Sequence, residues 1–130
     1  MDFGTYGLSE ASEKGAKMPV IDPVSGKPFD GVFINVVGSD SKTYRRAYTA
    51  MRRSIIGLDK TPDEDQVDCF EADAIAKCIT GWNGIVWEGE SLPYNHENAV
   101  MLVKKHHWLI DQIEAFTRKR ENFFSQKSVD

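Results

Sequence analysis

Three histidines, two cysteines and a run of carboxylates are the residues of this chain best suited to chemistry. Adjacent His106 and His107 would point about 100° apart on a helix, so they cannot easily hold one metal ion together. His107 and Asp111 are four residues apart, but no third side chain has the spacing that a zinc site needs. We therefore expect no metal and no cofactor, and we expect the histidines at solvated helix positions.

The two cysteines fall in one predicted helical segment. Nine helical residues separate the Cα atoms of Cys69 and Cys78 by about 13 Å, which is beyond disulfide reach. A reducing compartment is therefore expected. The sequence shows no adjacent base that would activate either thiol, so both are interpreted as small buried hydrophobic residues.

The acidic segment from Asp59 to Asp73 is the other candidate for chemistry. A Ca²⁺ loop would need alternating ligands and a central glycine, whereas Pro62 and its neighbours predict a helix here. No phosphate-binding glycine loop or nucleophile elbow occurs in the sequence. We therefore expect a non-catalytic protein whose carboxylates form a solvated helix face.

A basic segment, Lys42–Arg53, directly precedes the acidic one and also contains Tyr44 and Tyr48. It could pair with the acidic helix, bind a partner protein or follow nucleic-acid phosphates. Pairing within the chain is the interpretation that the sequence favours. The net charge of −4 and the pI near 5.4 disfavour nucleic acid as the main partner.

Length and composition predict one globular domain. The chain has 130 residues, 41% hydrophobic and 28% charged, which is ordinary for a folded domain and not for a disordered chain. No apolar run approaches the roughly 20 residues that span a bilayer. Met1 to Lys17 lacks the apolar core of a signal peptide, so no membrane partner is expected.

An N-terminal arm and a β-hairpin are predicted before the helices. Residues 1–17 are small, polar and aperiodic, so we expect a flexible arm. Residues 18–38 are typical of a hairpin with a turn near Gly26. The second strand is rich in β-branched residues, and alternate residues such as Ile34 and Val36 share one face.

Two helices are predicted in the centre of the chain. The first spans residues 40–56, with Ser39 or Asp40 available as its N-cap. The second spans residues 61–80 and begins with a capping box at Thr61, followed by proline and two acidic residues.

The remaining segments complete the predicted fold. Residues 82–94 contain turn signals and predict a tight loop or a small hairpin. Residues 96–122 predict one last helix capped by Asn95. The expected fold is α+β and mainly α, a three-helix domain with an N-terminal hairpin and arm. It spans residues 18–130, with the helices in residues 39–124.

Aromatic residues suggest both a core and a partner site. Trp82 and Trp87 flank a glycine-containing turn and are expected to pack on Trp108 and the helix stripe. Late aromatic and basic residues lie near the chain end, where the aromatic side chains could either join the core or remain exposed as an apolar patch that binds a partner. The candidate partner-binding residues are Phe116, Arg118, Arg120, Phe123 and Phe124.

The C-terminal half carries an ordered series of motifs that resembles a known family. The series is Thr80-Gly81-Trp82-Asn83-Gly84, Gly89, Leu92-Pro93-Tyr94-Asn95-His96-Glu97-Asn98, Trp108-Leu109-Ile110-Asp111-Gln112-Ile113, Phe116 and Asn122-Phe123-Phe124. It resembles the small tail assembly chaperones of long-tailed bacteriophages. The resemblance covers residues 61–124 well and residues 18–57 more loosely.

The resemblance implies a function in phage assembly. Such a chaperone binds the tape-measure protein, keeps its apolar helices in solution and assists polymerisation of the tail tube. The tail tube protein is a further expected partner, self-association is expected, and the place of action is the host bacterial cytoplasm. The alternative is a structural head–tail connector or tail completion protein. A weaker alternative is a small nucleic-acid-binding regulator that uses the segment Lys42–Arg53.

Overall fold

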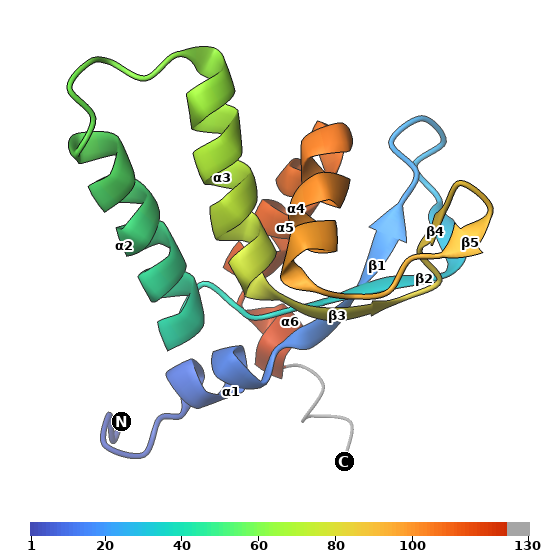
Figure 1. Cartoon of the computed structure of the whole chain (residues 1–130). Coiled ribbons are helices and arrows are strands. Elements are labelled where there is room, and N and C mark those ends of the chain that lie inside the picture. The colour runs from blue at the N-terminus through green and yellow to red at the C-terminus, as the bar shows by residue number, and fades with distance from the viewer. Residues whose placement is uncertain (125–130) are drawn as a thin grey trace.

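The protein, described here for residues 1–124 by a computed structural model, has the expected mainly helical α+β fold (Figure 1). Within these residues it forms six helices and five strands. They are α1 (Leu8–Lys14), β1 (Ala16–Ile21), β2 (Pro28–Val36), α2 (Lys42–Ile56), α3 (Glu64–Cys78), β3 (Ile79–Asn83), β4 (Val86–Trp87), β5 (Glu90–Ser91), α4 (His96–Lys105), α5 (His107–Arg118) and α6 (Glu121–Phe124). The predicted domain end at residue 130 lies outside the described residues.

An antiparallel sheet of order β1-β2-β3 forms the base of the molecule. The predicted hairpin is confirmed as β1 and β2, and Gly26 in its turn has a φ of 74°. Ile34 of β2 pairs with Met18 on one side and with Trp82 of β3 on the other. Strand β3 is a correction, because its residues were expected at a helix end and in an irregular segment.

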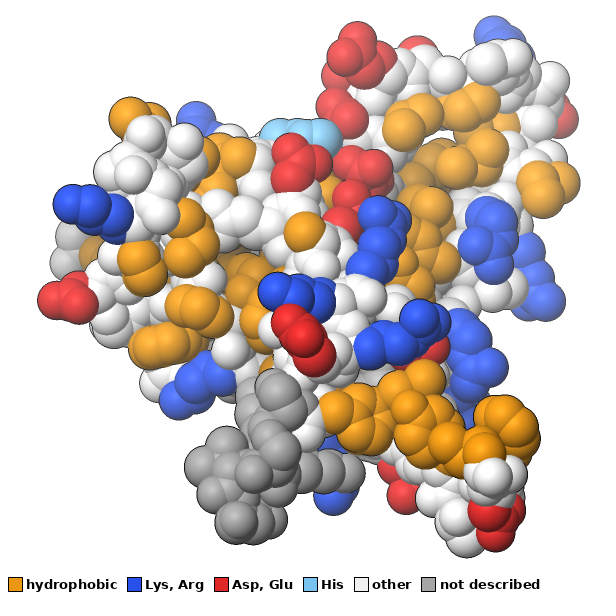
Figure 2. Space-filling model, turned by 180° about the vertical axis from the view of Figure 1, so that it is seen from behind, with side chains coloured by type: hydrophobic (Ala, Val, Ile, Leu, Met, Phe, Trp, Pro, Cys, Tyr) orange, Lys and Arg blue, Asp and Glu red, His pale blue; other side chains and the backbone are white. Residues whose placement is uncertain are grey.

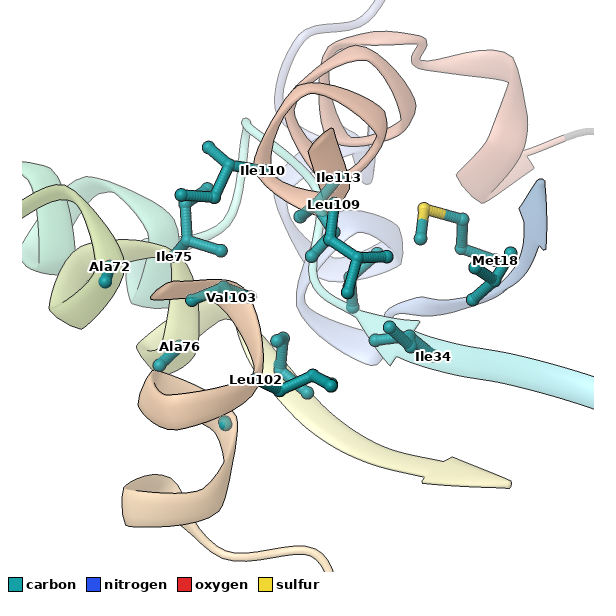
Figure 3. Packing of buried hydrophobic residues seen from close by; sticks show 14 of the residues in the cluster. Met18, Ile34, Ala72, Ile75, Ala76, Leu102, Val103, Leu109, Ile110 and Ile113 are labelled. Atoms are coloured by element: carbon teal, nitrogen blue, oxygen red, sulfur yellow. The ribbon is translucent and has the colours of Figure 1, made fainter. Parts of the chain in front are cut away.

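Helices α3, α4 and α5 cover one face of this sheet (Figure 1). Buried and exposed residues alternate along β1, so every second side chain points to the helices. Figure 3 shows Met18 and Ile34 of the sheet close to Leu102 of α4 and Leu109 of α5. Ile34 and Val36 are fully buried, so the face that these two residues share is the covered face of the second strand.

The N-terminal segment contains a docked helix, which corrects the expectation of a flexible arm. Helix α1 buries Ala11 and Ser12. The carboxylate of Glu13 accepts hydrogen bonds from the backbone N–H groups of Lys42 and Thr43, at 2.9 and 3.2 Å, and from the Thr43 hydroxyl. These bonds lower the pKa of Glu13, the Thr43 hydroxyl contributing most. A short helix is stabilised mainly by such tertiary contacts, which its own sequence does not reveal.

The N-terminal caps of α2 and α3 differ from the predicted ones. Ser41, not Ser39 or Asp40, caps α2 by accepting a hydrogen bond from the backbone N–H of Tyr44 at 3.1 Å. In α3 the cap is Asp63 rather than Thr61. The Asp63 carboxylate accepts from the backbone N–H of Gln66 at 2.8 Å. The Gln66 side chain accepts from the Asp63 N–H at 3.0 Å.

The predicted last helix is divided into α4 and α5, which is a further correction. His106 has φ −122° and ψ 76°, outside the helical region, and separates the two helices. Asn95 caps α4 as predicted. After the break, Gln112 of α5 accepts from the N–H of Ile21 at 3.0 Å and donates to its carbonyl at 2.6 Å. These bonds fasten α5 to the end of β1.

The segment between β3 and α4 forms a small hairpin, β4–β5, as one of the two predicted alternatives. Trp82 donates from Nε1 to the carbonyl of Leu92 at 2.8 Å, and the Tyr94 hydroxyl donates to the carbonyl of Ile79 at 2.6 Å. Trp82 and Trp87 both pack against the main core, as does Trp108, but the ring contacts within residues 1–124 do not join either of them directly to Trp108 as expected. Their ring neighbours are Tyr94 for Trp82, with centroids 5.2 Å apart, and His106 for Trp87, at 6.0 Å.

The cap of α3 gives a test of this fold. Replacing Asp63 with alanine should lower the free energy of unfolding by about 0.5–2 kcal/mol, because the backbone N–H of Gln66 at the helix start loses its partner. Thr61→Ala should change it by less than about 0.5 kcal/mol. The urea midpoints of the two variants measure the difference. A larger loss for Thr61→Ala would contradict the observed helix start.

Candidate interaction surfaces

The C-terminal aromatic residues lie together, but they pack into the fold. Phe123 is 6% exposed and belongs to the main core. Its ring meets that of Phe116 edge to face, with centroids 5.7 Å apart. Phe124 is half-buried, and its ring stacks on Tyr6 at 6.3 Å. Phe123 is therefore a core residue, and not the exposed anchor that its place near the chain end suggested.

The two candidate cations near this end also make contacts within the chain. Arg120 donates two hydrogen bonds to the Asp40 carboxylate, at 2.7 and 3.1 Å, and these raise the pKa of Arg120. Arg118 lies 3.8 Å from a carboxylate oxygen of Glu114 on its own helix. A hydrogen bond with Tyr44 is the largest cause of the raised pKa of Arg118. Both arginines thus connect the C-terminal helices to the segment that contains α2.

Phe116 also borders a surface hollow that the sequence analysis did not indicate. This hollow lies between β1 and the end of α5 and is lined by Met18, Pro19, Ile21 and Phe116, among others. Its lining comes from two segments far apart in the sequence, so the residue pattern of either one could not reveal it. Through this hollow, the half-buried side chain of Phe116 is accessible from the surface.

Helices α2 and α3 form a projecting hairpin, which is the second candidate surface. Near the body, Ala47 packs with Val37 and Cys78 in a small separate cluster. Among the described residues, none from 48 to 71 is buried. The outer half of the hairpin nevertheless carries apolar residues: Met51, Ile55, Ile56, Val67 and Phe70.

These apolar residues are arranged for contact along one side of the hairpin. Tyr48, Met51 and Ile55 recur at helical spacing on α2, and Val67 and Phe70 do so on α3. Figure 2 shows a hydrophobic strip along this lobe, which is at upper right in that view. Half-covered apolar strips of this kind are typical of protein-binding surfaces.

The basic side of α2 faces away from α3. The cations Lys42, Arg45, Arg46 and Arg53 share one helical face and surround a shallow hollow with Thr49 and Ala50. None of these four side chains lies within ion-pair distance of a carboxylate in residues 1–124. The expected pairing of the basic helix with the acidic helix is therefore wrong.

The carboxylates of α3 instead face histidines of α4 and α5. Asp73 binds His96 Nε2 at 2.9 Å and Lys77 Nζ at 3.1 Å. Burial acts to raise the pKa of Asp73, but these hydrogen bonds together outweigh it and lower that pKa. Glu71 lies 3.2 Å from His107 Nε2, and burial raises the pKa of Glu71. His96 and His107 are both exposed, as expected, but each is paired with a carboxylate of α3, which was not expected.

The arrangement of the histidine, cysteine and acidic side chains decides whether a metal ion could bind and whether either thiol is accessible. No group of three or more histidine, cysteine or acidic side chains in residues 1–124 is arranged to hold a metal ion. Cys69 and Cys78 are both free thiols, and the Cys69 Sγ lies 3.2 Å from Lys104 Nζ. Cys78 is buried as expected, whereas Cys69 is exposed, which corrects its predicted burial. Burial raises the pKa of Cys78 to about 12.

None of the helices in the described part of the chain combines the length and the apolar character needed to cross a bilayer.

The family comparison identifies a relationship for most of the chain. A family model described as YdaY prophage protein matches residues 39–130. The match begins just before α2 and leaves out α1, β1 and β2. No curated protein and no solved structure gives a significant match to the chain.

The burial of Phe123 gives a test of the aromatic end. Phe123→Ala should lower the free energy of unfolding by about 3–5 kcal/mol, because it leaves a cavity between α6 and the core. Phe3→Ala is the matched control, since Phe3 is 81% exposed and should change stability by less than about 0.5 kcal/mol. Thermal melts compare the two. Equal melting temperatures for both variants would show that Phe123 is not a core residue.

The different exposure of the two thiols gives a second test. In the native protein, Cys69 should react with an aromatic disulfide reagent, whereas the buried Cys78 should react after unfolding. The measured stoichiometry should therefore be one thiol per native chain and two in denaturant. Cys69→Ser should abolish the native reaction. A native reaction that survives this substitution would contradict the observed burial of Cys78.

Proposed function

We propose that this chain, which belongs to the YdaY prophage protein family, is an assembly chaperone for long phage tails that binds the tape-measure protein. The family membership makes it a phage-related protein. The chaperone function goes further, and it is supported by the motif series of the C-terminal half and by the projecting α2–α3 hairpin.

The motif series supports the proposal indirectly. Its residues build the part of the fold from which the α2–α3 hairpin projects. The series begins at β3, continues through the Pro93–Asn98 entry to α4 and ends along α5 and α6. Trp82 and Tyr94 of the series make partly buried hydrogen bonds, to the carbonyls of Leu92 and Ile79, that hold the segment after β5 against β3. Its members therefore have structural roles, and they do not themselves form the exposed apolar strip.

The observation that carries the proposal is the incomplete burial of the α2–α3 hairpin. An amphipathic helix normally buries its apolar stripe, yet no described residue from 48 to 71 is buried. Val67 is 39% exposed, and Met51, Ile55 and Phe70 are only half-buried. A tape-measure protein is long and helical, so an apolar stripe of its own could complete this strip by helix-in-groove docking.

The proposed mechanism is masking, without catalysis or a cofactor. Apolar contacts along the strip would supply affinity, and nearby charged side chains would set orientation and the rate of association. The proposed place of action is the host bacterial cytoplasm, before the client enters the growing tail. Phe116 and the hollow beside β1 would be a second contact region for the client or for the tail tube protein.

Substitutions in the strip test the proposal. Ile55→Gln with Val67→Gln should reduce recovery of a co-expressed tape-measure fragment from the same prophage by about tenfold or more. Two apolar side chains would then no longer be buried on binding. Glutamine keeps helix propensity, so the melting temperature should stay within about 5 °C of the original. Soluble client recovered per chain is the measurement.

Val24→Gln with Val86→Gln is the matched control, because Val24, in the β1–β2 turn, and Val86, in β4, are both exposed and lie outside the α2–α3 hairpin. Full client recovery by the strip variant would refute the hairpin as the binding surface. Retention of the protein in purified particles would instead favour the connector alternative. Salt-sensitive retention on DNA without client binding would favour the nucleic-acid alternative.

A further inference from the structure

We propose that the basic face of α2 docks the acidic tip of the α2–α3 hairpin of a second copy of this chain, head to tail. The basic face comprises Lys42, Arg45, Arg46 and Arg53, around Thr49 and Ala50. The acidic tip comprises Asp59, Asp63, Glu64 and Asp65, beside Ile56. This contact does not depend on the client, since it uses the side of α2 opposite the apolar strip.

The basic face is a strongly charged surface whose cations form no ion pair within residues 1–124, although the Glu13 carboxylate near the start of α2 is close enough to act electrostatically on Arg46. Arg45 and Arg46 are exposed, and Arg45 Nε donates only a long hydrogen bond, 3.4 Å, to the backbone carbonyl of Ser41. No carboxylate of residues 1–124 forms an ion pair with either arginine. Guanidinium groups form their strongest contacts with carboxylates or phosphates in bidentate geometry. The face is therefore suited to an anionic partner.

The acidic tip has the complementary properties. Its four carboxylates are exposed, and none forms an ion pair in the described part of the chain. Asp63 additionally caps α3. Lys60 lies among them, so the tip keeps a net negative charge. Ile56, the last residue of α2, is 81% exposed and precedes these carboxylates in the chain, so an apolar side chain is available near the tip.

Distance keeps the inner part of the basic face, Arg45 and Arg46, from pairing with the tip of the same chain. Ten helical residues separate Arg46 from Ile56, which is about 15 Å along a rigid helix. The basic pair, Arg45 and Arg46, lies toward the body, whereas the tip lies at the far end of the same hairpin. In Figure 2, acidic side chains together with a basic one lie at the top of this lobe, and further basic side chains lie lower on it. A second copy can bring the two surfaces together.

A second copy fits this face better than a nucleic acid does. A polyanion lying along α2 would meet the carboxylates at the end of the helix, which would repel it. The tyrosines of α2, Tyr44 and Tyr48, pack against the Val37 and Cys78 cluster and cannot stack on bases. A short acidic tip avoids both conflicts.

The proposed contact joins different surfaces of two copies, so it is heterologous. Each added copy would leave one basic face and one acidic tip unoccupied, and assembly would continue to longer oligomers. Exposed ion pairs are individually weak and are screened by salt. The association should therefore depend strongly on both protein and salt concentration.

Neutral substitutions in complementary variants test the contact. At about 50 mM NaCl the wild-type average mass should rise with protein concentration, and at about 500 mM it should fall toward the monomer. Arg45→Gln with Arg46→Gln, and separately Asp59→Asn with Glu64→Gln, should each weaken self-association by about tenfold. An equimolar mixture of the two variants should form a heterodimer and no larger species, because it retains one intact contact. Sedimentation velocity measures all of these masses.

Lys27→Gln with Lys105→Gln controls for the loss of two cations, and Asp30→Asn with Glu90→Gln for the loss of two carboxylates, at exposed positions outside the contact. Both controls should associate like the wild type, and circular dichroism should confirm that every variant is folded. The proposal is overturned if the wild type stays monomeric, if either contact variant associates normally or if the mixture yields no heterodimer. Duplex DNA retention by a monomeric wild type, lost in the arginine variant, would assign the face to nucleic acid.

Discussion

Burial of one face of a three-stranded sheet is the interaction on which the rest of this structure depends. Ile34 and Val36 of the central strand β2 are completely buried beneath α3, α4 and α5. The chain leaves β2 through Gly38, where a Cβ atom would lie 2.1 Å from the Ser12 hydroxyl and 3.0 Å from the Phe123 ring. Glycine is therefore required at the point where α1, α6 and the start of α2 converge.

The small size of this sheet explains why one hairpin remains partly uncovered. Three helices already occupy the covered face, and α3 shares its inner residues Ala72, Ile75 and Ala76 with that core. Helix α2 packs on the other side of α3 and contributes Ala47 to a separate cluster. Its contact with α5 is polar, through the Tyr48 hydroxyl and Glu114 at 3.2 Å. The outer parts of α2 and α3 therefore extend beyond the core that residues 1–124 provide.

Local patterns predicted the elements whose signals lie within a few residues, and they failed where distant contacts decide. The hairpin turn at Gly26 and the cap at Asn95 are local, and both were predicted correctly. Strand β3 follows α3 directly and is defined by its pairing with β2, about 45 residues earlier in the chain. The break at His106 was invisible because Leu102 and Leu109, seven residues apart, keep the phase of one continuous helix.

The candidate surfaces were harder to predict. On an amphipathic helix such as α2, the side that the apolar residues turn toward the protein decides where the charged side on the opposite face points. Adjacent basic and acidic segments suggest pairing, but Tyr48 and the apolar residues after it turn the opposite side of α2 toward α3. That orientation directs Arg45 and Arg46 away from the body. The carboxylates of α3 meanwhile meet histidines that come from α4 and α5, which no local pattern connects to them. Hydrophobic facing and long-range topology together decide which charges are neutralised within the chain and which remain available to a partner.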